Sequence, residues 1–402
     1  MASIFQRFKN YFTSNKEQRS TSIGWANLFN GVTSTTISNE SVNATSAMGL
    51  SAVYACVRVI AETISSLPLN LYERNGNDRV LDANNPLYFM MHSEPNQYMS
   101  KYVFMEAWIA TLLLYGNAYA LINRDGRGNP ISLSMIHPDN VSVESIDSWY
   151  GFRIKGIEGN IDSSDILHIP DLTFDGIVGQ SRISALKETI GLGLAAQRYG
   201  SQFFGSGAKI SGVLSHPGKL GPDALQSLMQ SWSQAYQGNG PFKTAILEEN
   251  MQYKPISLPP DQAQFIQTQK LNVLDISRAF RVPPHKISDL ERSTFSNIEH
   301  QSIEFVTDCI RPLCTKLEQE FNRKLLFEND KGRKYFEFNL NGLLRGDAKT
   351  RAEYYNKLFQ IGAMSQNEIR SKENLNSVGP LGDKLYVPMN MAAIDEVSDE
   401  QE

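Results

Sequence analysis

Two glycine-containing stretches have the composition of phosphate-binding loops. Residues 191–196, GLGLAA, resemble a dinucleotide fingerprint, in which glycines permit a tight turn beside a pyrophosphate. That function needs a preceding strand and a helix that opens at the motif, whereas these residues lie inside a helical pattern. Residues 212–219 end in Gly-Lys, but the spacing is one residue too long and Leu220 stands where a magnesium-binding hydroxyl is required. Neither stretch supports nucleotide binding.

Histidine and acidic side chains are the usual metal ligands and acid–base catalysts. The six histidines show no pairing at a spacing of three or four residues, and no G-x-S-x-G nucleophile motif occurs. The densest group is Asp165, His168, Asp171 and Asp175. Here we favour ordinary polar residues at turns and strand ends over a metal site. The sequence therefore predicts no metal, no cofactor and no enzymatic activity.

Cysteine usage and charge exclude further classes. Cys56, Cys309 and Cys314 are odd in number and form no C-x-x-C pair, which argues against a disulfide framework or a structural zinc site. The chain has 41% hydrophobic and 20% charged residues, typical of a soluble globular protein. Its net charge is −5, and residues 391–402 form an acidic tail without a base. A protein that clamps a phosphate backbone should be strongly basic, so a tight general DNA binder is excluded.

The elements that must position any site are helices and short strands. The 402 residues predict two or three domains. Apolar residues at helical spacing predict helices at residues 50–67, 101–115, 184–204, 222–236, 260–280, 298–327 and 347–360. Short apolar runs between turn residues predict strands at residues 69–73, 118–123, 131–136, 141–144, 152–157, 166–169, 212–214, 244–247, 253–256 and 335–339. Sheet and helices in one block predict an α+β fold. Pro312 should kink the longest helix because proline lacks an N–H.

The N-terminal region differs from the rest in composition. More than half of residues 13–46 are Ser, Thr or Asn, which predicts a flexible or partner-ordered arm, with regular structure from about Met48. Residues 1–12 have the pattern of a short amphipathic helix. We favour docking of this helix on another protein over anchoring to a membrane surface. No secretory signal is visible, and the longest apolar run, residues 108–122, is shorter than the ~20 residues that span a bilayer.

A series of segments, in order, resembles the compact portal proteins of long-tailed bacteriophages. Each motif is weak by itself, and the ordered series from residue 50 to residue 390 carries the resemblance. The segments are residues 53–71, 85–96 (NPLYFMMHSEPN), 112–125 (LLLYGNAYALINRD), 176–186 (GIVGQSRISAL), 203–214 (FFGSGAKISGVL), 276–285 (ISRAFRVPPH), 297–299, Pro312, 343–347 (LLRGD) and 362–370 (GAMSQNEIR). The arm before residue 48 and the acidic tail match no motif of the family.

The resemblance implies a ring, typically of twelve subunits, at one vertex of the phage head. DNA is packaged, retained and ejected through such a ring. The family's parts carry over as a flexible N-terminal arm (1–48), a wing (49–183), two stem helices (184–207 and 259–282) around an α/β clip insert (208–258), a tunnel loop (283–297), a long kinked helix with inner wing and small crown (298–390), and the acidic tail (391–402).

The same resemblance assigns site residues and partners. In the tunnel loop, His285, Lys286 and Arg292 would face the DNA channel. In the clip, a turn would dock the motor and adaptor, formed by Gly238, Asn239, Gly240 and Pro241. The implied partners are further copies of the chain, double-stranded DNA, the terminase packaging motor, a head-completion or adaptor protein, and the major capsid protein or scaffold, with no membrane. The implied location is the capsid portal vertex, and the host cytoplasm during assembly.

Two other classes stay open. One is a different structural ring or adaptor protein of the virion, which would be shorter and would lack the helix–insert–helix–loop–kinked helix series. The other is an enzyme whose site uses no recognised motif, which turnover of a substrate would reveal.

Overall fold

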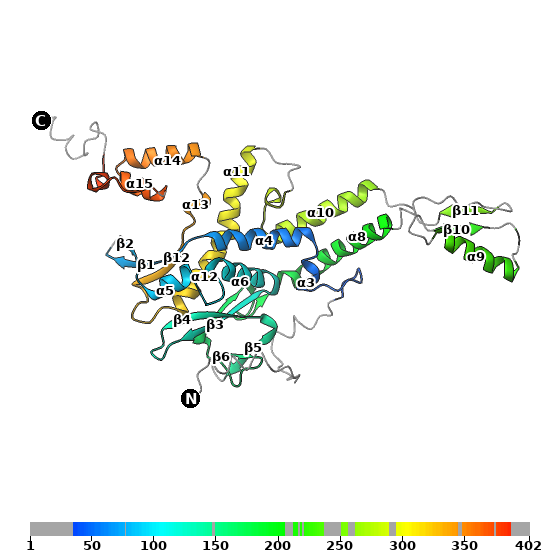
Figure 1. Cartoon of the computed structure of the whole chain (residues 1–402), viewed down its shortest axis with the longest axis horizontal. Coiled ribbons are helices and arrows are strands. Elements are labelled where there is room, and N and C mark those ends of the chain that lie inside the picture. The colour runs from blue at the N-terminus through cyan, green and yellow to red at the C-terminus, as the bar shows by residue number, and fades with distance from the viewer. Residues whose placement is uncertain are drawn as a thin grey trace. The chain divides into compact units, whose positions relative to one another are not determined.

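The computed structural model describes residues 35–386, with gaps at residues 77, 147–148, 206–211, 216–217, 219–220, 237–250, 256–261, 289–294, 345–347 and 374. The chain divides into two compact units. The first unit comprises Met1–Arg292 and Asp308–Phe338, and the second comprises Ser293–Thr307 and Asn339–Glu402. Helices and antiparallel strands occur together in the first unit (Figure 1), so the predicted α+β class is confirmed.

The first unit contains two packed helices, α4 (Ser51–Ser66) and α6 (Lys101–Tyr115). Helix α4 stops just before Pro68, whose ring disfavours helical backbone at the preceding residue. Helix α6 begins where the Ser100 hydroxyl accepts the Val103 N–H and ends at Gly116 in the left-handed conformation. The face of α4 that packs inward repeats at helical spacing through Val53, Val57, Ile60 and Ile64.

Two three-stranded antiparallel sheets pack with these helices. Their strand orders are β4-β3-β7 and β12-β1-β2. The strands are β1 (Leu69–Asn75), β2 (Asp78–Leu81), β3 (Asn117–Arg124), β4 (Pro130–Ile136), β7 (Ile166–Pro170) and β12 (Lys334–Phe338). Leu121 of central β3 stands opposite Ser134 on one side and Ile166 on the other, and Leu71 of β1 stands opposite Phe336. The 85–96 motif contains an additional helix, α5 (Pro86–His92), capped by Asn85.

Three further strand pairs are two-stranded. They are β5 (Val141–Ile146) with β6 (Trp149–Ile154), β8 (Leu172–Thr173) with β9 (Gly179–Gln180), and β10 (Gly212–Ser215) with β11 (Gln252–Pro255). The β5–β6 hairpin contributes Phe152 and Ile154 to a small core shared with Tyr119, Leu121 and Ile166. The strand predicted at residues 244–247 lies outside the described residues.

An aromatic core joins segments that are far apart in the sequence. Trp108 of α6 stacks on Phe321 of α12 (Arg311–Lys324), with ring centroids 6.1 Å apart. Phe321 in turn meets the edge of Phe336 on β12 at 6.1 Å. All three side chains are buried, so α12 closes the core formed by α6 and the β12-β1-β2 sheet.

The predicted helices around the insert are present as a pair. Helix α8 (Lys187–Gly205) follows the one-turn helix α7 (Arg182–Ala185), and α10 (Gln262–Phe280) lies beside α8 (Figure 1). Between them in the sequence come β10, helix α9 (Pro222–Tyr236) and β11.

The helical stretch predicted over residues 298–327 is present, but it is not one regular α-helix kinked at Pro312. The chain forms α11 (Phe295–Glu304), a π-helix (Phe305–Ile310) and then α12. Pro312 lies in the first turn of α12, where a missing N–H is tolerated, so the irregularity falls before the proline and not at it. The carbonyl of Asp308, four residues before Pro312, instead accepts a hydrogen bond from Arg281 Nη1 at 3.3 Å.

The second unit consists of short helices. They are α11, α13 (Asn341–Leu344), α14 (Ala348–Gln360), α15 (Gln366–Lys372) and a 3-10 helix (Pro380–Asp383). Ser365 and Glu368 form a capping box at the start of α15, with both reciprocal hydrogen bonds formed. Across the described ranges of both units, no helix has the length and apolar character needed to cross a bilayer.

Candidate functional site

Helices α8 and α10 approach closely at a glycine. A Cβ at Gly193 would lie 2.7 Å from the side-chain oxygen of Asn272 and 3.0 Å from a methyl of Leu50. The Asn272 amide nitrogen donates to the carbonyl of Thr189 at 2.6 Å, which ties the two helices together. A Cβ at Gly191 would come within 2.6 Å of Thr36. Gly193 therefore permits close packing against α10 and Gly191 permits close packing against Thr36, and the stretch lies inside α8 as its pattern predicts.

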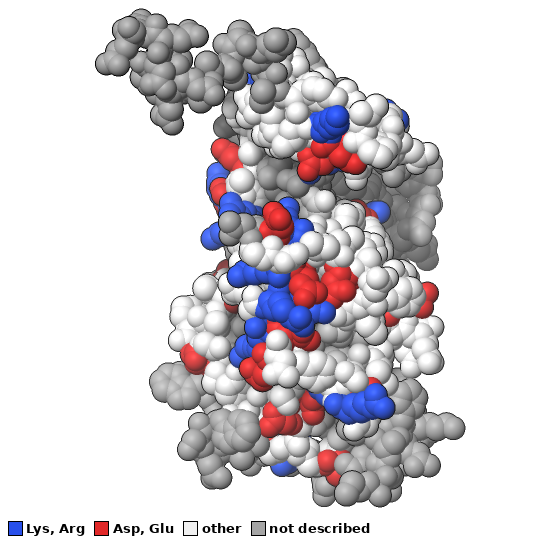
Figure 2. All heavy atoms as spheres, turned by 90° about the vertical axis from the view of Figure 1, so that its left-hand side faces the viewer, with Lys and Arg blue, Asp and Glu red and all other residues white. Residues whose placement is uncertain are grey.

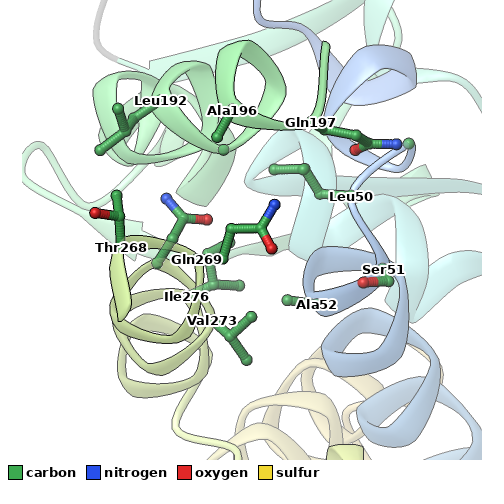
Figure 3. Close-up of a pocket in the computed structure, with 13 residues that line it drawn as sticks. Leu50, Ser51, Ala52, Leu192, Ala196, Gln197, Thr268, Gln269, Val273 and Ile276 are labelled. Atoms are coloured by element: carbon green, nitrogen blue, oxygen red, sulfur yellow. The ribbon is translucent and has the colours of Figure 1, made fainter. Parts of the chain in front are cut away.

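A pocket of about 260 Å³ lies where α8, α10 and the start of α4 meet (Figure 3). Its wall combines apolar and amide side chains. The lining residues are Gly49, Leu50, Ser51, Ala52, Leu192, Gly193, Ala196, Gln197, Thr268, Gln269, Asn272, Val273 and Ile276. In Figure 3 the side chains of Gln197 and Gln269 extend from the two helices toward the turn that carries Leu50.

The segment before α4 is ordered against α8, although we expected regular structure to begin near Met48. The backbone N–H of Ile37 donates to Glu188 at 3.1 Å, and the buried carboxylate of Glu40 pairs with Arg198 at 2.7 Å. A short helix, α3 (Ala44–Ala47), follows with a capping box from Asn43. This polar segment cannot bury enough surface to fold alone, and it is ordered here because α8 supplies its charged partners.

The end of α10 is fixed by buried contacts. Phe280 and Val282 are buried, and the Arg182 guanidinium lies 5.6 Å from the Phe280 ring centroid. Arg281, which stands between Phe280 and Val282, adopts left-handed backbone with φ of 57°, and this turns the chain away from the helix axis. The Cys309 thiol donates to the Phe280 carbonyl at 3.5 Å. These contacts therefore fix the backbone position at which the predicted tunnel loop, from residue 283, begins.

Two of the three predicted channel-facing residues are described. His285 and Lys286 lie on a 3-10 helix (Pro284–Ile287) that packs against α4. His285 is half-buried and Lys286 is exposed. Ser288 ends this turn in left-handed backbone, with φ of 68°. Part of the predicted tunnel loop is therefore a short helix, whereas Arg292 lies outside the described residues.

The predicted docking turn of the clip also lies outside the described residues. This applies to Gly238, Asn239, Gly240 and Pro241. On either side of them the described chain forms α9, ending at Tyr236, and the β10–β11 pair in which Leu214 stands opposite Tyr253.

The four residues considered as a metal site, Asp165, His168, Asp171 and Asp175, bind other groups of the protein. Arg124 pairs with Asp165 at 2.9 Å, and Arg182 binds Asp171 through two hydrogen bonds of 2.5 and 3.1 Å. The Asp175 carboxylate accepts the Ile177 and Val178 N–H groups and the Thr173 hydroxyl within its own turn. Among the residues that the structure describes, no group of His, Cys, Asp and Glu is arranged to hold a metal ion.

His168 is a buried structural residue. Its ring stacks on Tyr119 with centroids 4.4 Å apart, and its Nε2 lies 3.0 Å from the Asn117 side-chain oxygen. That oxygen also accepts the Gly179 N–H, while the Asn117 amide donates to the Gly179 carbonyl. The oxygen can only accept, so Nε2 carries the proton. Burial lowers the pKa of His168 to about 3, so the ring is neutral near pH 7.

The cysteines are also structural. All three thiols are free and buried. Burial raises the pKa of Cys56 to about 12 and that of Cys309 to about 11, and it raises the pKa of Cys314 as well. A nucleophilic cysteine needs a lowered pKa, so these three thiols serve packing and not catalysis.

Charges are paired on the face that carries β1, β2 and β12. Figure 2 shows Lys and Arg lying among Asp and Glu across this face. Arg79 binds Glu337 at 2.9 Å, and Lys334 binds Asp82 at 2.6 Å. Such a surface offers opposite charges side by side, which does not suit a continuous phosphate backbone.

Sequence reasoning missed the contacts that join α8 to its neighbours. Asn272 and the Glu40–Arg198 pair carry no motif. The signal that was available is the pair of glycines inside a helical pattern, which commonly marks close packing.

The comparisons with known proteins agree with one another. Residues 51–374 match the family described as "Phage portal protein". The chain is 34% identical over 377 residues to the "Probable portal protein" of Streptomyces phage phiC31, covering 89% of this chain and 82% of that protein. It is 32% identical over 366 residues to the "Portal protein" of Enterobacteria phage HK97, covering 88% and 86%.

Solved structures share the fold. An HK97 family phage portal protein from Corynebacterium diphtheriae superposes with a TM-score of 0.57 at 18% identity, covering 74% of this chain and 95% of that one. A chain in the virion of a native gene transfer agent particle gives 0.58 at 22% identity, covering 83% and 94%. A chain in the neck of that particle, computed with C12 symmetry, gives 0.57 at 22% identity, covering 83% and 92%.

The family match covers most of the chain, and the two phage relatives exceed 30% identity over most of their own length. Both findings confirm the identification made from the ordered segments. The chain belongs to the phage portal protein family, whose members are structural proteins of the virion and not enzymes.

Proposed function

We propose that copies of this chain assemble head to tail into a closed ring of twelve at one capsid vertex. The phage genome would pass through this ring during packaging, would be retained by it, and would leave through it on ejection. Chains of the same fold occur in particle necks computed with C12 and with C6 symmetry, which supports a ring. A head-to-tail contact repeated by a rotation that closes gives such a ring.

The observation that carries the proposal is the α8–α10 pair. Two helices of nineteen residues each lie side by side and flank the insert of residues 208–258. In the proposed ring they form the stem that lines the channel, and the insert forms the clip. The Gly193–Asn272 contact brings α8 and α10 close together, so that the two helices would move as one unit in the stem.

The loop after α10 would present positive charge to the DNA. Lys286 is exposed on its 3-10 helix, and His285 precedes it. With Arg292 they are the proposed channel-facing residues. One or two cations per subunit, repeated around a ring, give equivalent weak contacts. Because each exposed contact is worth about 1 kcal/mol or less, a moving duplex can exchange them easily. A chain with a net charge of −5 suits a channel that should not hold DNA firmly.

The remaining parts have proposed partners. The clip, through Gly238, Asn239, Gly240 and Pro241, would dock the terminase motor during packaging and a head-completion or adaptor protein afterwards. The wing, residues 49–183, would face the major capsid protein or scaffold.

Electron microscopy of the purified full-length chain tests the ring directly. End-on views should show closed rings with a central hole wide enough for duplex DNA. Native mass measurement should show a ring-sized species, with twelve copies as the expected number. A chain that stays monomeric or dimeric at micromolar concentration across a range of salt would overturn the proposal.

A DNA packaging assay distinguishes a portal ring from a ring that serves only as an adaptor. In a reconstituted reaction with procapsids and motor, a portal ring is required for DNA to enter. An adaptor ring would be dispensable at that step and would be needed only after the head is full.

A further inference from the structure

The pocket between α8, α10 and α4 has the size of a site for side chains. Its volume of about 260 Å³ is below the roughly 300–1,000 Å³ typical of small-molecule sites. Leu50, Val273 and Ile276 supply apolar wall. Gln197 and Gln269 supply amide groups that can bond to the backbone of an inserted segment (Figure 3). Leu192 at its edge is 49% exposed, so apolar surface there is left uncovered.

The described chain starts beside this pocket. Thr36 packs against Gly191, and Ile37 is held by Glu188, both on α8. Gly191 is next to Leu192, which lines the pocket. Thr35, the first described residue, therefore lies at the surface of α8, within about one helix diameter, or ~10 Å, of the pocket.

One apolar group lies within reach. Thirty-four residues precede Thr35, and the nearest large apolar side chains among them are Trp25, Leu28 and Phe29. Six residues from Phe29 to Thr35 extend at most about 20 Å, enough to pass around α8. Residues 4–12 also include apolar side chains, but more than twenty residues separate them from Thr35.

We propose that Trp25, Leu28 and Phe29 dock into the pocket between α8, α10 and α4 of their own chain. A segment tethered by six residues has an effective concentration in the millimolar range, which favours it over the same segment of another copy. Docking covers Leu192 and straps the stem helices to the start of α4. The inference does not depend on the ring or on DNA.

Limited proteolysis of the full-length chain with chymotrypsin tests the docking. Cleavage after Trp25, Leu28 and Phe29 should be slow in the natural chain. Leu192→Asp should accelerate it on the order of tenfold, the value expected from losing the burial of one leucine. Trp25→Ser should accelerate cleavage at Leu28 and Phe29 in the same way. Leu172→Asp, at a leucine that is 62% exposed on β8, is the matched control and should change nothing. Equal cleavage rates in all four chains would overturn the proposal.

Cross-linking identifies which chain supplies the segment. A Trp25→Cys and Leu192→Cys double variant, treated with a short bis-maleimide, should give a link within one chain. The native thiols are buried, with pKa values raised by burial, so they do not compete. When the two single variants are co-expressed, no Trp25–Leu192 link between chains should form. Links between chains in that mixture would assign the pocket to a second copy and overturn the same-chain proposal.

Discussion

Gly193 of α8 lies where a side chain would meet the amide of Asn272 on α10. The amide oxygen is 2.7 Å from the position of a Cβ at residue 193, and the amide nitrogen donates to the Thr189 carbonyl at 2.6 Å. Asn272 is buried and cannot swing away without losing that hydrogen bond. The absence of a side chain at Gly193 therefore sets the spacing of the two helices.

Gly193→Val should lower the free energy of unfolding by about 1 to 3 kcal/mol, because the added carbons overpack the α8–α10 contact. Urea denaturation measures the change. Gly205→Val is the matched control, since a Cβ at that end of α8 meets no heavy atom within 4 Å. Equal losses in the two variants would show that helix propensity and not the Asn272 contact is responsible.

Lys101 predicts a pH dependence of stability. Its Nζ is buried and donates to the carbonyls of Ser65 and Leu67 at the end of α4. Burial lowers its pKa from 10.5 to about 8. Between these values the unfolded chain binds more protons than the folded chain, so stability rises with pH.

Relative to Lys101→Met, the natural chain should therefore gain stability from about pH 8 to about 10.5, by about 1 kcal/mol per pH unit. Lys155→Met, at an exposed lysine, should track the natural chain over the same range. A constant difference between the natural chain and Lys101→Met at all these pH values would contradict a lowered pKa.

The proposed channel loop predicts a functional effect of charge. Lys286→Glu combined with Arg292→Glu should still form rings but should package DNA more slowly or retain less of it, because a ring of cations becomes a ring of anions. A packaging assay with procapsids measures both quantities. Arg127→Glu with Lys155→Glu, two exposed cations of the first unit, is the control for net charge. If the loop variant packages and retains DNA as the natural chain does, Lys286 and Arg292 do not face the channel.

The clip predicts a separable docking function. Deletion of residues 236–242 should leave rings visible by electron microscopy while abolishing binding of the packaging motor. The reason is that the deleted segment begins at Tyr236, the last residue of α9, and does not include either residue of the Gly193–Asn272 contact that joins the stem helices. Motor binding measured on isolated rings is the readout, and packaging at the natural rate by the deletion variant would exclude this docking site.

Local sequence rules predicted most of the elements. Ser100 and Gly116 fix the two ends of α6 through a hydroxyl cap and a left-handed residue, and neither effect depends on distant contacts. The capping box of Ser365 and Glu368 and the pair of helices around the insert were predictable for the same reason. The ordered series of motifs identified the family, because a series spread over most of the chain is far more specific than any single motif.

Only the tertiary structure decided which residues meet. Residues 35–47 were expected to be an arm because their composition is polar, and they are ordered because Glu188 and Arg198 of α8 provide partners more than a hundred residues away. The π-helix before Pro312 could likewise not be predicted from the sequence, because a proline indicates a missing N–H but not the position at which the helix becomes irregular. The sequence by itself determined the elements and the family, through local backbone chemistry and motif order. The folded chain determined the α8–α10 spacing and the pocket beside it, because both depend on contacts between segments that the sequence does not place together.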